Sequence, residues 1–434
     1  MSSGDIDFQA SGPFEGPEKL LEIWFEPSPA DVPNINGSEA KLGLRAVPRQ
    51  IWEDMLDIVK CKVLNVIEGL EMDAYLLSES SFFVSPHRLI LKTCGTTLNL
   101  LGLPRIIEIA ANYANMHTVH RFFYSRKSFM FPERQLGPHR DWKQEVEFLD
   151  RIFKNGAAYT IGKVNGDHWL LYMTTPDSVS PYVSHDLSMR TMTAHMDDRP
   201  LDFTIEILMT DLSPTASKPF FFSDSQTELH SANPSALGLN LSEKLGITDI
   251  FPPSLTHLDA YAFTPCGYSA NALLRWGDES LNYDSDSSTE SRPPSIGVNH
   301  TDKYSHAFTK AGHFGEGYYT IHVTPEDGWS YASFECNVPL SSKRSHNGKI
   351  PDLQTLVKRV VNIFQPGRIT VSLFISSEDN DPGDAESAVE GAQKAFRAAL
   401  TRETEDLHRP YKRTDKINYE FGGYDLAYAS FELL

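Results

Sequence analysis

The chain has 434 residues, of which 40% are hydrophobic and 22% charged, and its formal net charge at pH 7 is −19. This is the composition of a folded globular protein, and the acidic excess argues against nucleic acid or an anionic membrane surface as partner and suits a cationic small molecule. No long apolar run predicts a membrane span, and four cysteines without a CxxC pair predict a reduced, cytoplasmic protein.

The first half of the chain predicts strands interleaved with helices. Apolar periodicity and turn residues place these elements in order: strand 19–25, helix 49–64, short strands 74–77, 82–84 and 89–91, helix 98–116, strand 119–129, helix 142–153, and a hairpin over 157–173. The hairpin turns at Asn165-Gly166, a strong two-residue turn signal.

The second half repeats this alternation. The predicted elements are strands 203–209, 259–263, 318–324 and 331–336, helix 353–364, strand 369–375 and helix 387–400. The repeated alternation suggests an internal duplication, although the residues show no repeat. Segments 277–315 and 376–386 are rich in acidic residues and serine, and we expect them to be mobile insertions.

A polar triplet, Glu79-Ser80-Ser81, interrupts two apolar runs in the stretch from Asp73 to Thr97. Serine-rich interruptions of this kind are usually surface turns. Here the triplet is part of LSESSFFVS (77–85), which is followed by KTCGTT (92–97) and, much later, by FTPCGYS (263–269) and YYTIHVTPE (318–326).

These four segments resemble the eukaryotic S-adenosylmethionine decarboxylase proenzymes, and further matching segments follow the same order. They are FEGPEKLLEIWF (14–25), FFYSRKSFM (122–130), PHRDW (138–142), NGAAY (155–159) and TIEILMTDL (204–212). The resemblance implies an α+β fold, a four-layer α/β/β/α sandwich of two mainly antiparallel sheets with outer helices, as one domain over 1–434. The length of 277–315 departs from the family pattern.

The resemblance also implies self-cleavage between Glu79 and Ser80 into a beta chain (1–79) and an alpha chain (80–434). Ser80 becomes a pyruvoyl group that forms a Schiff base with S-adenosylmethionine and withdraws electrons as carbon dioxide leaves; no metal is implied. His322 matches the residue that abstracts the Ser80 α-proton, and Ser269 matches the residue that supports the acyl shift. A histidine between apolar strand residues is otherwise more often structural, although imidazole can accept a proton near neutral pH.

Other positions match the family's catalytic and substrate-binding residues. Cys94 matches the proton donor for the substrate α-carbon, whereas a buried cysteine elsewhere is usually only a small apolar residue. Glu15 and Glu18 match acidic catalytic residues. The substrate site is implied to comprise Phe14 and Phe263, whose rings stack on the two faces of adenine, Glu326, which accepts from the ribose hydroxyls, and the Glu79 backbone.

An activator site is implied as well. Strand alternation places Asp202, Thr204 and Glu206 on one face, which is commonly a solvated face. In animal members of the family the matching acids form an interior cluster that binds putrescine, and its other members match Glu22, Ser125, Glu145 and Glu335. A diamine would compensate a buried acid cluster. The sequence leaves open whether the protein is a monomer or a homodimer of cleaved protomers.

Three other functions stay open from the sequence. The first is a processing-deficient paralogue that serves as a regulatory subunit, although such a subunit has no chemical reason to keep Ser80, Cys94, Ser269 and His322. The second is a serine hydrolase using Ser80 or Ser269 with His322, but neither serine lies in a GxSxG elbow. The third is a binding module that turns over no substrate.

Overall fold

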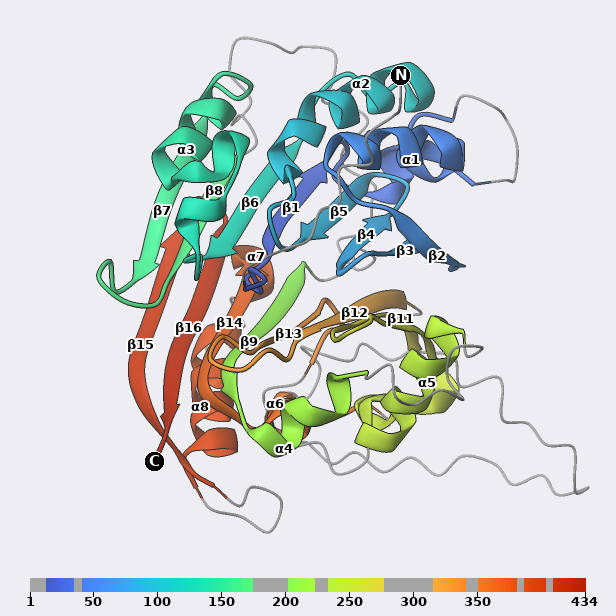
Figure 1. Cartoon of the computed structure of the whole chain (residues 1–434). Coiled ribbons are helices and arrows are strands. Elements are labelled where there is room, and N and C mark those ends of the chain that lie inside the picture. Colours follow the sequence, from blue (N-terminus) through green and yellow to red (C-terminus); the bar gives the residue numbers. More distant parts are fainter. Residues whose placement is uncertain are drawn as a thin grey trace, which may run out of the picture.

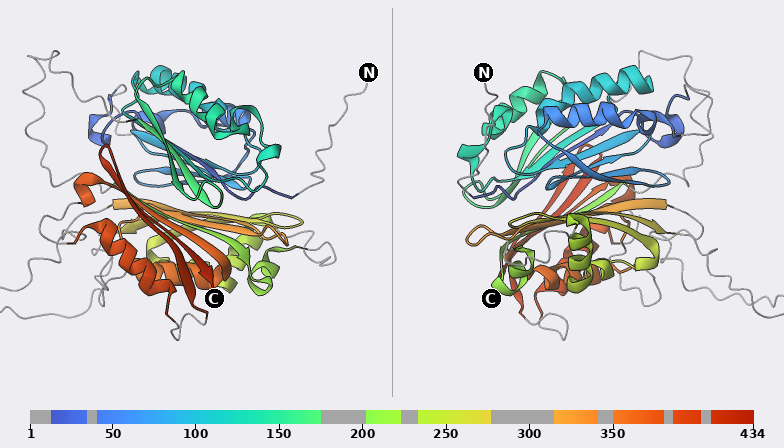
Figure 2. Two further views of the ribbon diagram at one scale, coloured as in Figure 1. Left: turned by 90° about the vertical axis from the view of Figure 1, so that its left-hand side faces the viewer. Right: turned by 45° about the vertical axis from the view of Figure 1, so that its right-hand side comes forward.

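The computed structural model describes residues 13–34, 41–174, 202–222, 233–276, 315–340, 350–380, 386–402 and 409–434. Two eight-stranded antiparallel sheets pack face to face, with helices on the outer face of each sheet (Figures 1 and 2). This is the predicted α/β/β/α sandwich. Because the sheets cover each other's inner faces, residues that project from both meet in a buried layer between them.

The N-terminal sheet, called sheet A, is built from the first half of the chain. Its strands, in spatial order, are β2 (Val63–Glu68), β3 (Asp73–Leu77), β4 (Ser80–Val84), β5 (Arg88–Thr93), β1 (Lys19–Trp24), β6 (Arg121–Lys127), β8 (His168–Thr174) and β7 (Gly156–Gly162). The first segment of the chain, β1, therefore lies in the middle of the sheet, between β5 and β6.

The second sheet, called sheet B, has the same strand order when each number is raised by eight. Its strands are β10 (Thr256–Ala262), β11 (Tyr268–Trp276), β12 (Gly315–Thr324), β13 (Tyr331–Cys336), β9 (Phe203–Leu212), β14 (Pro366–Ser376), β16 (Tyr424–Leu433) and β15 (Tyr411–Phe421). The suspected duplication is thus present at the level of topology.

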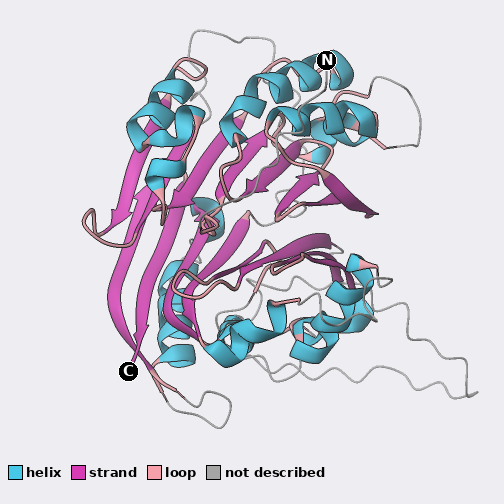
Figure 3. Ribbon diagram, viewed as in Figure 1, coloured by secondary structure: helices cyan, strands magenta, loops and turns pink. Residues whose placement is uncertain are grey.

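Helices form the two outer layers (Figure 3). Sheet A is covered by α1 (Arg49–Ile58), α2 (Leu103–Ala114) and α3 (Trp142–Asp150), and sheet B by α4 (Pro214–Ser217), α5 (Pro234–Leu245), α6 (Leu353–Phe364) and α8 (Ala388–Leu400). The two largest apolar clusters lie between each sheet and its helices. Two smaller ones lie between the sheets.

Several elements differ from the predictions. The first helix ends at Ile58 instead of continuing to residue 64, because Lys60 has φ 65° and the chain then enters β2. Strands β2, β11, β15 and β16 and helices α4 and α5 were not predicted. The start of the second acidic segment, 376–386, is ordered, since Ser377–Asn380 form α7. Residues 381–385 of that segment lie outside the described residues, and so does the first acidic segment, 277–315, except for Gly315 at the start of β12. None of the described helices is long and apolar enough to cross a membrane.

Candidate active site

The predicted cut lies in the tight turn between β3 and β4. Leu77 pairs with Ser80 across this hairpin, so the turn consists of Ser78 and Glu79 alone. Glu79 has φ 54°, in the left-handed region, which costs a residue with a side chain about 1 kcal/mol. The Glu79–Ser80 peptide bond therefore follows a strained residue, and the Ser80 side chain is completely buried.

Cys94 approaches this peptide bond from the end of β5. Its Sγ donates to the carbonyl oxygen of Glu79 at 2.6 Å, and its backbone N–H donates to Ser80 Oγ at 3.4 Å. Burial, followed by the charges of Glu79 and Glu18, raises the pKa of the Cys94 thiol well above its ordinary value. The protonated thiol therefore points at the carbonyl oxygen on which negative charge would develop if Ser80 attacked the carbonyl carbon.

Ser269 and His322 face the hairpin from sheet B. They are register partners on β11 and β12, and Ser269 Oγ lies 2.9 Å from His322 Nδ1. Burial, helped by the charge of Lys92, lowers the pKa of His322 to about 3. The ring therefore stays neutral at physiological pH with one nitrogen unprotonated, and the low pKa makes it a weaker base than an imidazole that titrates near neutrality.

In this uncut chain His322 contacts Ser81 and not Ser80. Strand alternation sends the two hydroxyls to opposite faces of sheet A. Ser81 Oγ faces sheet B and lies 2.9 Å from His322 Nε2, whereas Ser80 Oγ lies 3.9 Å from Cys94 Sγ. Ser81 was not among the predicted site residues, although alternation along a strand already separates it from Ser80.

The predicted substrate residues converge around the cut. The backbone N–H of Phe14 donates to Glu326 Oε2 at 3.3 Å. A Cβ atom added at Gly267, whose φ is 116°, would lie 3.2 Å from Glu79 Oε1 and 3.5 Å from the Phe263 Cβ, so both residues border this glycine. Burial and the nearby Glu326 raise the pKa of Glu79 to about 7. Phe14, Glu79, Phe263 and Glu326 thus lie close together in the fold.

Glu15 and Glu18 are buried in the same region, with exposures of 3% and 5%. The Glu15 carboxylate accepts from the backbone N–H groups of Met130 and Phe131, each at 2.8 Å, and burial raises its pKa. Glu18 accepts from the hydroxyls of Tyr331, at 2.6 Å, and Ser333. Both acids therefore tie the chain before β1 to other parts of the fold instead of facing water.

An acid cluster occupies the buried layer between the sheets. Lys92 Nζ of sheet A lies 2.6 Å from Glu335 Oε2 and 3.5 Å from Glu206 Oε1 of sheet B. Burial, with Glu335 and Glu18 nearby and despite Lys92, raises the pKa of Glu206 to about 8. Lys92 was not among the predicted residues, although strand alternation places it on the inner face of β5.

Glu22 and Asp202 extend this cluster along the same layer. Glu22 Oε1 lies 3.2 Å from Arg88 Nη1, and burial raises the pKa of Glu22 to about 7, with a contribution from Asp202. Asp202 accepts from the Tyr424 hydroxyl, and burial raises its pKa too. Ser125 and Thr204 share the inner faces of β6 and β9 by strand alternation.

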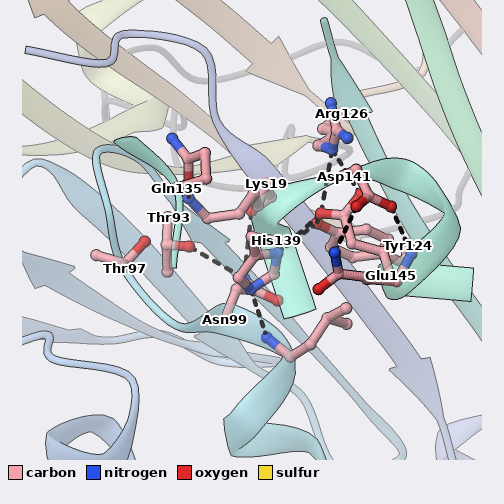
Figure 4. Close-up of polar contacts among 12 residues, drawn as sticks. Lys19, Thr93, Thr97, Asn99, Tyr124, Arg126, Gln135, His139, Asp141 and Glu145 are labelled. Carbon is pink, nitrogen blue, oxygen red and sulfur yellow. Dashed lines mark hydrogen bonds and ion pairs between the residues drawn. The ribbon is translucent and has the colours of Figure 1, made fainter. Parts of the chain in front are cut away.

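Glu145 is not brought to the acid cluster. It lies on α3, on the outer face of sheet A, where it bonds Arg126 at 2.8 Å, Tyr124 at 2.6 Å and His139 at 2.8 Å (Figure 4). Tyr124 and Arg126 flank Ser125 on β6 and therefore point away from the inner face that Ser125 occupies. The sheet separates Glu145 from the other six residues of the predicted activator site.

Lys19 is a second buried cation that the sequence did not indicate. Its Nζ donates to the Gly95 carbonyl at 2.8 Å and to Gln135 Oε1 at 3.4 Å, on the same outer face (Figure 4). Burial lowers the pKa of Lys19 to about 8. Because Gly95 follows Cys94 directly, Lys19 holds the segment that carries the thiol.

Comparisons of sequence with known proteins point to a single family. The model of the adenosylmethionine decarboxylase family matches residues 11–432. The S-adenosylmethionine decarboxylase proenzymes of Xenopus laevis and Drosophila melanogaster are 34% and 35% identical to this chain, each over 96% of this chain and 95% of its own length. A crystal structure of a Trypanosoma brucei AdoMetDC monomer aligns over 81% of this chain and 99% of its own at a TM-score of 0.44 and 19% identity.

Proposed function

Since the chain belongs to the adenosylmethionine decarboxylase family, we propose that it cleaves itself between Glu79 and Ser80 and then decarboxylates S-adenosylmethionine with the pyruvoyl group formed from Ser80. The product would be decarboxylated S-adenosylmethionine, the aminopropyl donor for spermidine and spermine. The observation that carries the proposal is the thiol of Cys94 aimed at the Glu79 carbonyl, 2.6 Å away, beside the buried Ser80 hydroxyl. The four cysteines are free thiols, which supports a cytoplasmic location.

In the proposed cleavage, Ser80 Oγ attacks the Glu79 carbonyl carbon, and the C–N bond breaks to leave an ester and a free Ser80 amine. Cys94 stabilises the oxyanion by hydrogen bonding. Loss of the Ser80 α-proton to His322 then expels the Glu79 carboxylate, which becomes the new C-terminus of residues 1–79. Water converts the remaining dehydroalanine to a pyruvoyl group and ammonia. Glu79, already in a left-handed conformation, loses its strain when the chain is cut.

Position 80 suits a pyruvoyl group, because it is fully buried and bordered by a neutral thiol. When present, the ketone supplies the electron sink that no ordinary side chain offers for decarboxylation of an amino acid. We propose that Phe14, Phe263, Glu326 and the Glu79 backbone bind the nucleoside, with Glu15 and Glu18 shaping the same pocket. Cys94 then returns a proton to the substrate α-carbon. Release of labelled carbon dioxide from carboxyl-labelled S-adenosylmethionine tests the activity directly.

Substitution of Cys94 by alanine is expected to slow self-cleavage by about 10²- to 10³-fold, the usual cost of losing one oxyanion donor. The decarboxylation rate of any chain that does cut should fall as well, because the proton donor is missing. Gel densitometry over time measures the first effect, and carbon dioxide release per cut chain measures the second. Cys336→Ala is the matched control, because it removes a buried thiol that lies in sheet B and away from the cut, and this variant should cut normally. Equal cleavage rates for the two variants would contradict the role of Cys94.

We also propose that Glu22, Asp202, Thr204, Glu206, Glu335 and Ser125 bind putrescine as an activator. The buried cluster holds four carboxyl groups, those of Glu22, Asp202, Glu206 and Glu335, against the three cations Lys92, Arg88 and Arg121, and a diamine would neutralise the remainder. Glu145, which bonds Arg126 on the other side of the sheet, is outside this proposal.

Putrescine binding is expected to tighten as pH rises from 6 to 8. Glu206 and Glu22, with pKa values of about 8 and about 7, are protonated at pH 6 and must lose protons before they attract a cation. Each titrating carboxyl can change the dissociation constant by up to about tenfold per pH unit. Calorimetry in buffers of different ionisation enthalpy should therefore also detect proton release. A dissociation constant that is independent of pH, or one that Glu206→Gln leaves unchanged, would contradict this assignment.

A hydrolase is disfavoured although Ser269 and His322 form a serine–histidine pair. A hydrolytic triad needs a carboxylate on the second ring nitrogen to hold and stabilise the imidazolium. Among the described residues, His322 Nε2 contacts the hydroxyls of Ser81 and Thr320 instead. Labelling of an uncut chain by a serine-directed inhibitor would reverse this judgement.

A further inference from the structure

A second polar cluster joins the two sheets directly behind the cut, and the proposed function does not use three of its four members. Ser81 of β4 places its Oγ 2.6 Å from Asn271 Oδ1, 2.9 Å from Thr320 Oγ1 and 2.9 Å from His322 Nε2. Ser81, Asn271 and Thr320 are completely buried, and His322 is 4% exposed. With water excluded, each proton in the cluster must be donated to another member.

The orientation of the Asn271 amide is set from outside the cluster. Its Nδ2 donates to the backbone carbonyl of Tyr75 on β3 at 3.0 Å. A carbonyl oxygen only accepts, so the nitrogen of the amide must face Tyr75 and the Oδ1 must face Ser81. The Ser81 hydroxyl therefore donates its single proton to Asn271 Oδ1.

The hydrogen bond from Ser81 to Asn271 determines which nitrogen of His322 carries the proton. Ser81 Oγ has no proton left for His322, so Nε2 must be the donor across their 2.9 Å contact. The hydroxyl of Thr320 lies 2.9 Å from Ser81 Oγ and 3.0 Å from His322 Nε2. If it donated to Nε2, Ser81 Oγ would face both atoms with no proton between them, so the Thr320 hydroxyl donates to the remaining lone pair of Ser81 Oγ, and every group is then satisfied. In the neutral ring Nδ1 is consequently unprotonated, and it accepts the proton of Ser269 at 2.9 Å.

We propose that Asn271 is a positioning residue for self-cleavage, which fixes the tautomer of His322 through Ser81 and so keeps a proton acceptor facing Ser269. Without an acceptor at position 271, the Ser81 hydroxyl can turn and donate to Nε2. The ring proton then moves to Nδ1, and the lone pair that faced Ser269 is lost. The consequence for cleavage rests on the proposed function, whereas the tautomer does not.

The tautomer can be measured by nitrogen NMR in a chain labelled with ¹⁵N-histidine. Ser80→Ala provides an uncut chain and leaves the cluster intact, because Ser80 contacts Cys94 on the other face. The chain has 15 histidines, so the His322 signals are assigned as those missing after His322→Gln. We expect a neutral ring protonated at Nε2. A ring protonated at Nδ1 in this reference chain would overturn the inference without any further variant.

Two substitutions at position 271 separate hydrogen bonding from packing. Asn271→Leu has a similar shape but no acceptor, and it should move the ring proton to Nδ1. Asn271→Asp keeps an oxygen for Ser81, and its protonated form can also donate to Tyr75, so it should retain the Nε2 proton. The same tautomer in all three uncut chains would overturn the inference.

The same substitutions in the cleavable chain give the second readout. Asn271→Leu is expected to slow cleavage by about 10²-fold or more, a typical contribution of a positioned base, while Asn271→Asp should cut at close to the unsubstituted rate. If the leucine variant does not fold, the reference chain and the aspartate variant still decide the tautomer. An unsubstituted chain that never cuts would refute the proposed function alone. An Asn271→Leu chain that cuts at the normal rate, and whose uncut form keeps the Nε2 proton, would refute only this inference.

Discussion

Replacing Ser80 by alanine is expected to abolish self-cleavage and to leave one 48.7-kDa chain that releases no carbon dioxide from S-adenosylmethionine. Without Oγ the proposed nucleophile is missing, and the neighbouring Cys94 thiol, whose pKa is raised by burial, stays protonated as a hydrogen-bond donor to the Glu79 carbonyl. No ester can then form, so no dehydroalanine arises for water to convert to a ketone. The fold should survive, because the removed hydroxyl makes weak contacts with the thiols of Cys94 and Cys61 and accepts one backbone N–H at 3.4 Å. Denaturing mass spectrometry and a thermal melt measure both effects.

Ser78→Ala is the matched control for this substitution. Ser78 occupies the same two-residue turn, so its replacement disturbs the hairpin to a similar degree without touching the proposed nucleophile. This variant should cut. A Ser80→Ala chain that still separates into two pieces at the same position would show that another group, such as Ser81, attacks the carbonyl.

Replacing His322 by alanine is expected to stop cleavage at the ester, because the Ser80 α-proton then has no base. Loss of a positioned base slows a proton transfer by about 10²- to 10⁴-fold. The stalled chain should run as a single band, yet hydroxylamine should break it at the Glu79–Ser80 ester. A Ser80→Ala chain contains only amide bonds and should resist the same treatment.

His117→Ala is the control for the histidine substitution, since His117 is exposed and its imidazole bonds to Asn115, two residues away. It should cut like the unsubstituted chain. Resistance of the His322→Ala chain to hydroxylamine, despite a normal thermal melt, would contradict a role after ester formation. His322 would then have to act earlier, on the attacking hydroxyl.

The elements predicted correctly are those in which burial of one face spaces the apolar residues at a regular helical or strand period. The helix over 353–364 has the predicted bounds, and the three short strands around the cut are present as β3, β4 and β5. Strand β15 escaped prediction because it lies at the edge of sheet B and is largely half-buried or exposed, which leaves little apolar alternation. The first helix was extended too far because the apolar residues of α1 and β2 follow each other closely.

The site was predicted only as far as the family resemblance reached. Ser80 contacts Cys94, and Ser269 contacts His322, but Ser81, which was not predicted, lies between the two pairs. Contacts such as that of Asn271 with Ser81 join residues 190 positions apart. A contact between residues so far apart leaves no local sequence pattern that could predict it. Nothing in the sequence around Asn271 distinguishes it from a polar residue that faces solvent. Glu145 is the opposite case, a residue that the resemblance assigned to the activator site but that the structure places elsewhere. Its sequence match did not reveal that the sheet separates it from the acid cluster.

The duplicated topology accounts for the placement of the chemistry. The cut lies between β3 and β4, and Ser269 and His322 lie on β11 and β12, which hold the corresponding positions in sheet B. Face-to-face packing of equivalent strand pairs brings the scissile bond of one sheet to the polar residues of the other, as the views of the layers indicate (Figure 2). The strand β1 lies at the centre of sheet A, so we expect residues 1–79 to stay bound after cleavage.

The intact mass of the purified protein under denaturing conditions tests the central proposal most directly. We expect two chains of about 9 and about 40 kDa, the shares of residues 1–79 and 80–434 in the total mass, with the larger chain blocked to amine-specific sequencing. A single chain of 48.7 kDa that persists after incubation with putrescine would contradict the account. The protein would then be a processing-deficient member of the family that acts as a regulatory subunit.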